Sequence, residues 1–233
     1  MPLALTPEQI TTAKDECLKK FGHTRIVKID IDYPIDVTVL MAAFGLSEAA
    51  EYVDARAKSR RSAAAGLIAT RALLPSPKEL QEIRDGRRLP AIDAQIEVAY
   101  RRVMGFVSRA PSVSRLTSLT APPSMPADVL AQLVAKNPAD NLWSAVNEEN
   151  DFEVAFLAPV SETWAAATAA DERASQSGRG RLTAILDYAK DHVLWSPKPI
   201  AEFIDEKPGR AEELKQAFLE SGGAGAQASA SFL

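Results

Sequence analysis

The feature that most constrains the fold is a set of residues that end and start helices, recurring in the same order in the two halves of the chain. Proline and glycine interrupt helices because proline lacks a backbone donor and glycine tolerates a left-handed conformation. The matching landmarks are Ser76-Pro77-Lys78 and Ser196-Pro197-Lys198, then Pro90 and Pro208, then Gly105 and Gly223. This shared order predicts an internal duplication.

Apolar positions support the duplication. Leu80 and Ile83 follow the first proline motif at the spacing at which Ile200 and Phe203 follow the second. The other paired positions are Leu74 with Leu194, Ile96 with Leu214, Tyr100 with Phe218, and Ser47-Glu48 with Ser161-Glu162. The alternative is coincidence, because any chain of helices separated by prolines produces chance matches.

The first half is expected to begin with a helix, because Thr6, Pro7 and Gln9 form a helix-starting motif and Gly22 ends the apolar stripe. Residues 25–32 alternate between polar and apolar, which is typical of a strand. A second strand is expected within residues 37–44. Helices are expected over residues 47–74, over 78–84, and from Pro90 to Gly105.

The second half is expected to repeat this order, with a strand over residues 152–157 at the place equivalent to 37–44. Helices follow from Ser161, over 182–193, around Ile200 and up to Gly222. The fold class expected is therefore α+β and mostly helical, with two tandem copies of a small module of strands and helices. Its second core is expected to hold Trp164, Leu194, Trp195, Phe203 and Phe218.

The domain organisation follows from composition. Residues 1–106 are expected to form the first module, and residues 107–128, rich in proline, serine and threonine, a linker. Residues 129–223 form the second module, and residues 224–233 a flexible tail of small residues.

Charge is uneven along the chain, whose net charge is -4. Residues 1–110 carry 17 Lys and Arg against 14 Asp and Glu, whereas residues 111–233 carry 10 against 17. This difference is compatible with self-association or with an acidic partner for the first half. The net negative charge argues against nucleic acid as an obligate partner.

Cellular location is indicated by three absences in the sequence. Cys17 is the single cysteine, so an internal disulfide is excluded and a reducing compartment is favoured. The opening residues lack a basic segment and do not resemble a signal peptide. No apolar run approaches the roughly 20 residues needed to cross a bilayer. We therefore expect a soluble protein with no membrane partner.

No pattern in the sequence indicates catalysis. His23, His192 and Cys17 lack the clustering that metal sites require. Residues 177–181 (Ser-Gly-Arg-Gly-Arg) lack the third glycine and the lysine of phosphate-binding loops. We therefore expect no catalytic residue, metal or cofactor, and a protein that is not an enzyme.

Arginines gather in the first half and form the candidate partner-binding positions. These are Arg56, Arg60, Arg61, Arg87 and Arg88, with Arg84, Arg101 and Arg102 nearby in the sequence. They could form one positive surface for phosphate or for an acidic protein. The alternative is an ordinary solvated helix face, since Glu51 and Asp54 lie within a turn of the first arginines. The terminal Phe232 and Leu233 are either a hydrophobic anchor or an accident of sequence.

The second module carries a pattern of spacing with a family resemblance. Phe156-Leu157-Ala158-Pro159 precedes Ser161-Glu162-Thr163-Trp164, and the helices that follow end at a proline step and at a glycine. This pattern resembles tail assembly chaperones of long-tailed bacteriophages, best over residues 151–223 and more loosely over 36–105. The sequence departs from it where Gly45 stands near the place of Pro159, and in having two modules.

The resemblance implies a non-enzymatic phage protein that binds other structural proteins, such as the tape-measure protein or tail-tube subunits, in the host cytoplasm or the virion. A permanent capsid, collar or tail component is the first alternative. A nucleic-acid-associated protein that uses the arginines is the second.

Overall fold

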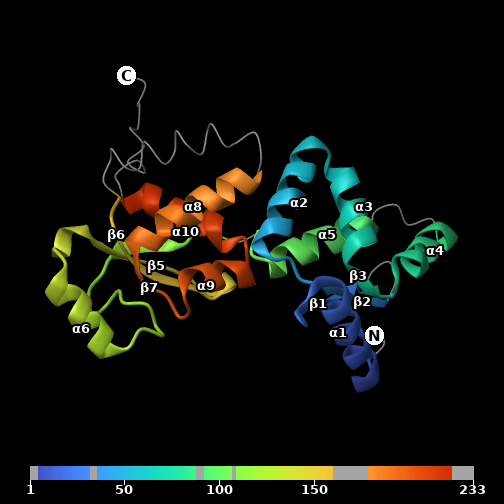
Figure 1. Cartoon of the computed structure of the whole chain (residues 1–233), viewed down its shortest axis with the longest axis horizontal. Helices are drawn as coiled ribbons and strands as arrows, with labels where there is room; N and C mark the ends of the chain where they lie inside the picture. Colours follow the sequence, from blue (N-terminus) through green and yellow to red (C-terminus); the bar gives the residue numbers. More distant parts are fainter. Residues whose placement is uncertain (1–4, 32–35, 88–91, 107–108, 160–177, 222–233) are drawn as a thin grey trace. The chain divides into compact units, whose positions relative to one another are not determined.

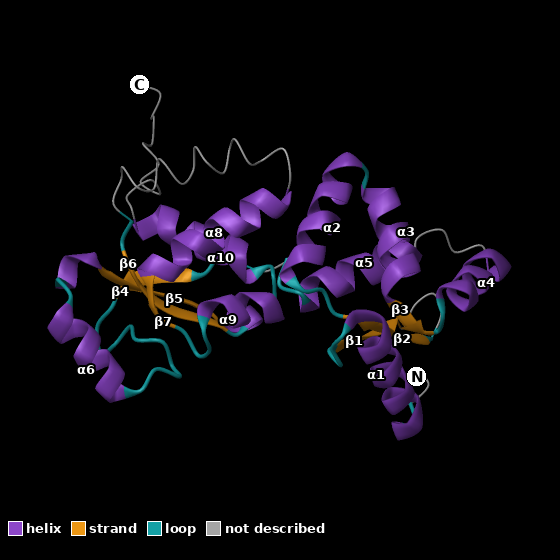
Figure 2. Cartoon of the chain, viewed as in Figure 1, coloured by secondary structure: helices purple, strands orange, loops and turns teal. Residues whose placement is uncertain are grey.

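A computed structural model describes residues 5–31, 36–87, 92–106, 109–159 and 178–221. The chain divides into two compact units, unit 1 (Met1–Val107) and unit 2 (Ser108–Leu233). None of the described helices is long and apolar enough to span a membrane. Each unit combines one antiparallel sheet with helices (Figures 1 and 2), so the α+β fold class predicted from the sequence is confirmed.

Unit 1 contains a three-stranded sheet in the order β1-β2-β3. Helix α1 packs against the strands, and α3 and α5 pack against the sheet as well. Its elements are α1 (Pro7–Phe21), β1 (Ile26–Ile31), β2 (Val37–Ala42), α2 (Leu46–Lys58), α3 (Arg60–Arg71), β3 (Ala72–Leu74), α4 (Pro77–Arg87) and α5 (Ile92–Val103).

Unit 2 contains a four-stranded sheet in the order β4-β5-β6-β7. Its elements are β4 (Ser112–Arg115), α6 (Ala127–Lys136), η1 (Ala139–Asn141), β5 (Leu142–Asn147), η2 (Glu148–Asn150), β6 (Phe152–Leu157), α8 (Gly178–His192), β7 (Val193–Trp195), α9 (Ile200–Glu206) and α10 (Arg210–Ser221).

The two units repeat one topology around an antiparallel hairpin whose two strands each have six residues. In β1–β2, Ile26 pairs with Ala42, and in β5–β6, Leu142 pairs with Leu157. The third strand joins each hairpin antiparallel with a register shift at the same place, between Leu40 and Met41 in unit 1 and between Ala155 and Phe156 in unit 2. The strands predicted within 37–44 and over 152–157 therefore occupy equivalent positions, as expected.

The repeat extends to the side chains. Beneath α1, the cluster on one sheet face includes Ile26, Leu40, Ala42, Leu73 and Leu74. Beneath α6, the strand positions equivalent to these five are Leu142, Ala155, Leu157, Leu194 and Trp195, and all five belong to one cluster. Leu194 is thus equivalent to Leu73, and the predicted match of Leu194 with Leu74 is displaced by one residue.

The segment predicted as a linker, residues 107–128, falls in unit 2 except for its first residue. Ser112–Arg115 forms β4, which pairs antiparallel with β5, and Leu116 is buried in the cluster beneath α6. Proline and serine content therefore misled the interpretation, because the apolar positions Val113 and Leu116 are enough to anchor one short strand. Strands β3 and β7 were also not predicted, since each is a three-residue strand at the end of a helix and is too short to show alternation. The six-residue β5 was not predicted either, because its sequence Leu-Trp-Ser-Ala-Val-Asn does not alternate regularly.

The second core contains part of the predicted aromatic set. Phe203 packs its ring 6.1 Å from that of Phe152, and Phe218 meets Phe156 edge-on at 5.2 Å. Leu194 and Trp195 instead lie in the cluster beneath α6. Trp164 lies outside the described residues.

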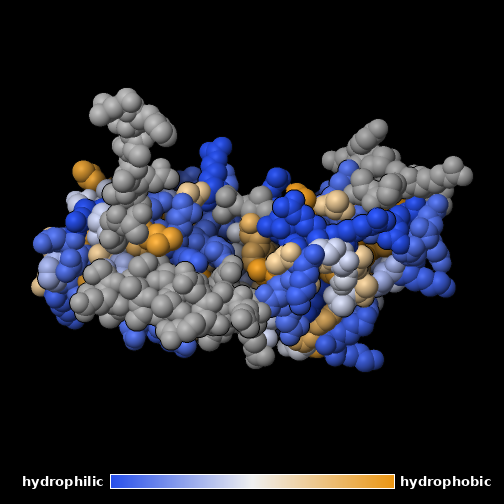
Figure 3. Space-filling model, turned by 90° about the horizontal axis from the view of Figure 1, so that it is seen from above, coloured by the Kyte–Doolittle hydropathy of each residue, from blue (hydrophilic) through white to orange (hydrophobic). Residues whose placement is uncertain are grey.

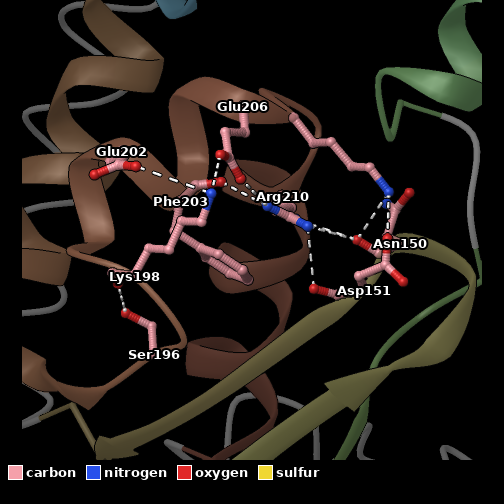
Figure 4. A network of polar contacts seen from close by, with 9 residues as sticks. Asn150, Asp151, Ser196, Lys198, Glu202, Phe203, Glu206 and Arg210 are labelled. Carbon is pink, nitrogen blue, oxygen red and sulfur yellow. Dashed lines mark hydrogen bonds and ion pairs between the residues drawn. The ribbon is translucent and has the colours of Figure 1, made fainter. Parts of the chain in front are cut away.

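A buried arginine joins α9 and α10 to the turn before β6 (Figure 4). Arg210 donates hydrogen bonds to the carbonyl oxygens of Asn150, Asp151 and Phe203, and its guanidinium lies 4.0 Å from the centre of the Phe203 ring. Burial lowers the pKa of Arg210, and the charge of nearby Glu206 opposes this effect. The arginine therefore provides hydrogen-bond donors for carbonyl oxygens that the helices and strands leave without a donor at this corner.

A carboxylate in unit 1 has a similar structural role. Glu48 accepts hydrogen bonds from the Gly45 N–H at 2.6 Å and from Arg71 at 2.9 Å. Arg71 is buried and lies over the rings of Phe21 and Phe44. Burial of Glu48 works against its charge, yet these two partners hold the pKa of the carboxyl below its ordinary value of 4.5.

We predict that Phe203→Ala lowers the free energy of unfolding by about 3–5 kcal/mol, because a large buried ring is replaced by a cavity. Urea denaturation followed by fluorescence measures the change. Leu119→Ala in the same unit is the matched control, since Leu119 is 94% exposed, and should change stability by less than about 0.5 kcal/mol. Equal effects of the two substitutions would contradict this core assignment.

We also predict that the stabilisation contributed by Glu48 is pH-dependent. Its folded-state pKa is lowered, so the contribution is present above pH 4.5 and is lost as the pH falls through the folded-state pKa. The difference in unfolding free energy between the wild type and Glu48→Gln should therefore shrink as the pH is lowered from neutral. The exposed Glu51→Gln on the same helix is the control, and a difference independent of pH would refute the prediction.

Candidate partner-binding site: an arginine-lined cleft in unit 1

The site begins at the corner between α2 and α3. Ser59 adopts an extended conformation, with φ of -159°, and its hydroxyl accepts a hydrogen bond from the Ser62 N–H at the start of α3. This N-cap separates two helices that would otherwise be continuous. Arg56 consequently lies at the end of α2, and Arg60 and Arg61 lie in the first turn of α3, so one helix corner brings three arginines together.

Two carboxylates of α5 hold arginines of the neighbouring helices. Glu97 is buried and accepts hydrogen bonds from Arg56 Nε at 2.9 Å and from the Tyr52 hydroxyl. Burial raises the pKa of Tyr52, and the bond to Glu97 adds to this effect. Asp93 accepts from Arg84 Nη1 at 2.8 Å, and this hydrogen bond is the main cause of the raised pKa of Arg84. Arg56 and Arg84 are therefore fixed in position by ion pairs.

These side chains line a cleft of about 990 Å³ within unit 1. The arginines Arg56, Arg60, Arg61 and Arg84 share its wall with Asp85, Asp93 and Glu97, and apolar surface comes from Ala64, Ala65, Ala94 and Val98. This volume lies at the upper end of the range typical of ligand sites. The cleft thus combines fixed positive groups with apolar lining residues.

The cleft keeps an excess of positive charge. Among the described residues, the side chains of Arg60 and Arg61 make no hydrogen bond or ion pair, and both residues are exposed. They stand at the positive end of the α3 dipole, in a first turn without an acidic residue, an arrangement that destabilises a helix slightly. In Figure 3, hydrophilic surface covers the region of α2 and α3. Within the described part of unit 1, no carboxylate pairs with these two arginines.

The charges of the cleft arginines also act on the neighbouring Arg101, where Tyr52 and Glu97 oppose them. Burial lowers the pKa of Arg101, and the charges of Arg56 and, more weakly, Arg60 lower it further. A negative group placed in the cleft would relieve this repulsion. The cleft is therefore electrostatically suited to carboxylate or phosphate groups.

The structure brings together part of the predicted set of binding residues. Arg56, Arg60 and Arg61 share the cleft, and Arg84 joins them. Arg87 is the last residue of α4, and its side chain is outside the described part. Arg88, Phe232 and Leu233 lie outside the described residues altogether. The sequence interpretation missed Asp93 and Glu97, although their four-residue spacing on one helix face was a usable signal.

A pair of potentially reactive side chains lies elsewhere in unit 1. Cys17 Sγ is 3.4 Å from His23 Nδ1, because the left-handed Gly22 turns the chain back beside α1. Cys17 has no exposed surface, and burial raises the pKa of its thiol. A nucleophilic cysteine needs a lowered pKa and access to substrate. The pair is consequently a packing contact and not a candidate active site.

The described ranges contain no candidate metal site. No cluster there brings together three or more His, Cys, Asp or Glu side chains. The lining of the cleft, as far as the structure describes it, also contains no cysteine, histidine or hydroxyl nucleophile.

Comparisons of this chain with protein-family models, with curated proteins and with solved structures find no match.

We predict that Glu97→Ala lowers the free energy of unfolding by about 1.5–3 kcal/mol, because Arg56 and Tyr52 lose a charged hydrogen-bond partner in a buried position. Thermal or urea denaturation measures the effect. Glu82→Ala is the control, since Glu82 is exposed and lies 3.9 Å from Lys78, and it should be nearly neutral. If Glu97→Ala left the free energy of unfolding unchanged, the carboxylate would not organise the cleft.

Proposed function

We propose that this chain is a non-enzymatic bacteriophage assembly or structural protein that acts by binding other structural proteins. The observation that carries the binding role is the arginine-lined cleft, in which two guanidinium groups are held by carboxylates and two more are unpaired within the described structure. The partner group that fits is an acidic segment of another protein.

A protein segment fits the cleft better than nucleic acid does. Asp85, Asp93 and Glu97 lie among the arginines and would repel a continuous phosphate backbone, whereas separated carboxylates can avoid them. The alanine and valine residues of the lining can contact small apolar side chains next to those carboxylates. The described lining has no aromatic ring on which a base could stack, and such stacking is the usual means of binding single strands.

The duplication adds a second reason for a binding role. Each unit has its own sheet and its own core clusters, so one chain carries two folded units that can each bind a partner. Binding through one unit raises the effective concentration of the other at its own partner. The opposite charge balance of the two halves allows them to prefer different partners or a second copy of the chain.

The phage assignment is supported by the resemblance in spacing of the second module to tail assembly chaperones. On this proposal the partners are tape-measure, tail-tube or capsid proteins, and the place of action is the host cytoplasm, the virion, or both.

The test is co-expression of the tagged full-length chain with the proteins encoded by the neighbouring reading frames. We expect capture of a structural protein by the wild type and at least about fivefold weaker binding by Arg60→Ser/Arg61→Ser, with a reduced dependence on salt. Lys19→Ser/Lys20→Ser on α1 is the matched control of equal charge change and should bind normally.

Equal binding by the wild type and the cleft variant would refute the role of the cleft. Tight DNA binding with a steep salt dependence would instead favour the nucleic-acid alternative. Turnover of a substrate by the pure protein would overturn the non-enzymatic assignment.

A further inference from the structure

The outer edge of β1 has backbone groups that point away from its own sheet. The Ala43 N–H donates to the Arg25 carbonyl oxygen, which makes residues 25 and 43 a hydrogen-bonded pair of the β1–β2 ladder. Because such pairs alternate along antiparallel strands, Ile26, Lys28 and Asp30 direct their N–H and C=O groups outward. Among the described residues, none forms a backbone hydrogen bond with this outer edge.

The equivalent edge in unit 2 is occupied. Strand β5 corresponds to β1, and its outward-facing residues are Leu142, Ser144 and Val146. The Leu116 N–H donates to the Leu142 carbonyl oxygen at 3.0 Å, and the register pairs Ser114 with Ser144. The repeated module therefore accepts an additional antiparallel strand at this edge, and in unit 2 that strand is β4.

The helices that pack over these two edges differ in the same way as the edges themselves. Helix α10 packs over β4 and β5, and its Glu213 and Ala217 are 5% and 0% exposed. Helix α5 is its equivalent and packs over β1, but the matching positions Gln95 and Ala99 are exposed and half-buried. One turn further along, Val103 is 45% exposed. The stripe that β4 helps to bury in unit 2 is thus open to solvent in unit 1.

We propose that the outer edge of β1, together with the open stripe of α5, is a second binding site, separate from the arginine cleft, which takes an extended segment of a partner protein as an added antiparallel strand.

The side chains of β1 specify the chemistry of that segment. Val27, Ile29 and Ile31 are buried on one face of the strand, so the residues opposite them should be apolar. Lys28 and Asp30 are exposed on the other face. An acidic residue opposite Lys28 and a basic residue opposite Asp30 are attractive, whereas like charges opposite one another are destabilising. The segment therefore reads apolar-basic-apolar-acidic-apolar from its N-terminus.

The position of α5 decides between a bare segment and a second folded copy. The sequence of β1 matches this pattern, so two β1 strands could in principle pair with each other. In such a pair, however, each copy would place its own α5 on the same face of the joined sheet, above the same junction. Helices need 8–10 Å between their axes, while paired strands lie only about 4.8 Å apart. The site therefore takes a strand that carries no helix on that face.

The test uses two synthetic peptides of identical composition and the full-length chain. The probe is Thr-Val-Lys-Val-Glu-Val-Thr, and the control exchanges its Lys and Glu. We expect the probe to bind about fivefold or more tightly than the control by fluorescence anisotropy, because both charge pairs change from attractive to repulsive. The chain variant Lys28→Asp/Asp30→Lys exchanges the two charges along β1. In this variant the preference between the two peptides should reverse.

Hydrogen exchange locates the bound peptide. The amides of Ile26, Lys28 and Asp30 should become protected, while those of Val27 and Ile29, which already point toward β2, should change little. Binding should be unaffected by Arg60→Ser/Arg61→Ser, which separates this site from the proposed function of the cleft. Equal affinity for the two peptides, a preference for the control, or a preference that does not reverse in the exchanged variant would overturn the proposal.

Discussion

The antiparallel hairpin of two six-residue strands is the constraint on which each unit depends. The pairing of Ile26 with Ala42, or of Leu142 with Leu157, sets which side chains face α1 or α6 and which face the helices on the opposite side of the sheet. Side chains alternate between the faces, so a shift of one residue would exchange the two sets completely. The bulge at the third strand then fixes where α3 and α8 must end. Packing of α5 and α10 follows from this frame.

Buried polar groups supply the hydrogen bonds that the hairpin and helices lack at the places where the backbone turns. Arg210 binds three carbonyl oxygens at the corner of α9 and α10, and Glu48 joins the start of α2 to Arg71. In unit 1 the same principle has a consequence at the surface. Glu97 and Asp93 neutralise Arg56 and Arg84 and hold them, so Arg60 and Arg61, opposed only by Asp85 among the described lining residues, leave the cleft with an excess of positive charge.

The sequence predicted a part of the candidate site. Arginines close together along the chain were identified, because residues at a helix corner remain close in space. Glu97 was not identified, because its role depends on α5 packing beside α2, where its partner Arg56 lies 41 positions earlier. Asp93 was not identified either, because its partner Arg84, nine positions earlier, lies on a separate helix. The open edge of β1 was also beyond sequence analysis. Its significance depends on β4 pairing with the equivalent strand of unit 2, and the proline and serine content around β4 is typical of a linker.

The sequence by itself determined the α+β class, the duplication, the equivalence of the two hairpin strands and the positions of most helices. These features are encoded locally, in alternation, helix caps and proline or glycine stops, which act over a few residues. The tertiary structure alone decided that residues 112–116 join a sheet, that β3 and β7 end their helices as strands, and which edge remains open. Each of these depends on hydrogen bonds and contacts between distant segments, and a short strand has too few residues to reveal its partner.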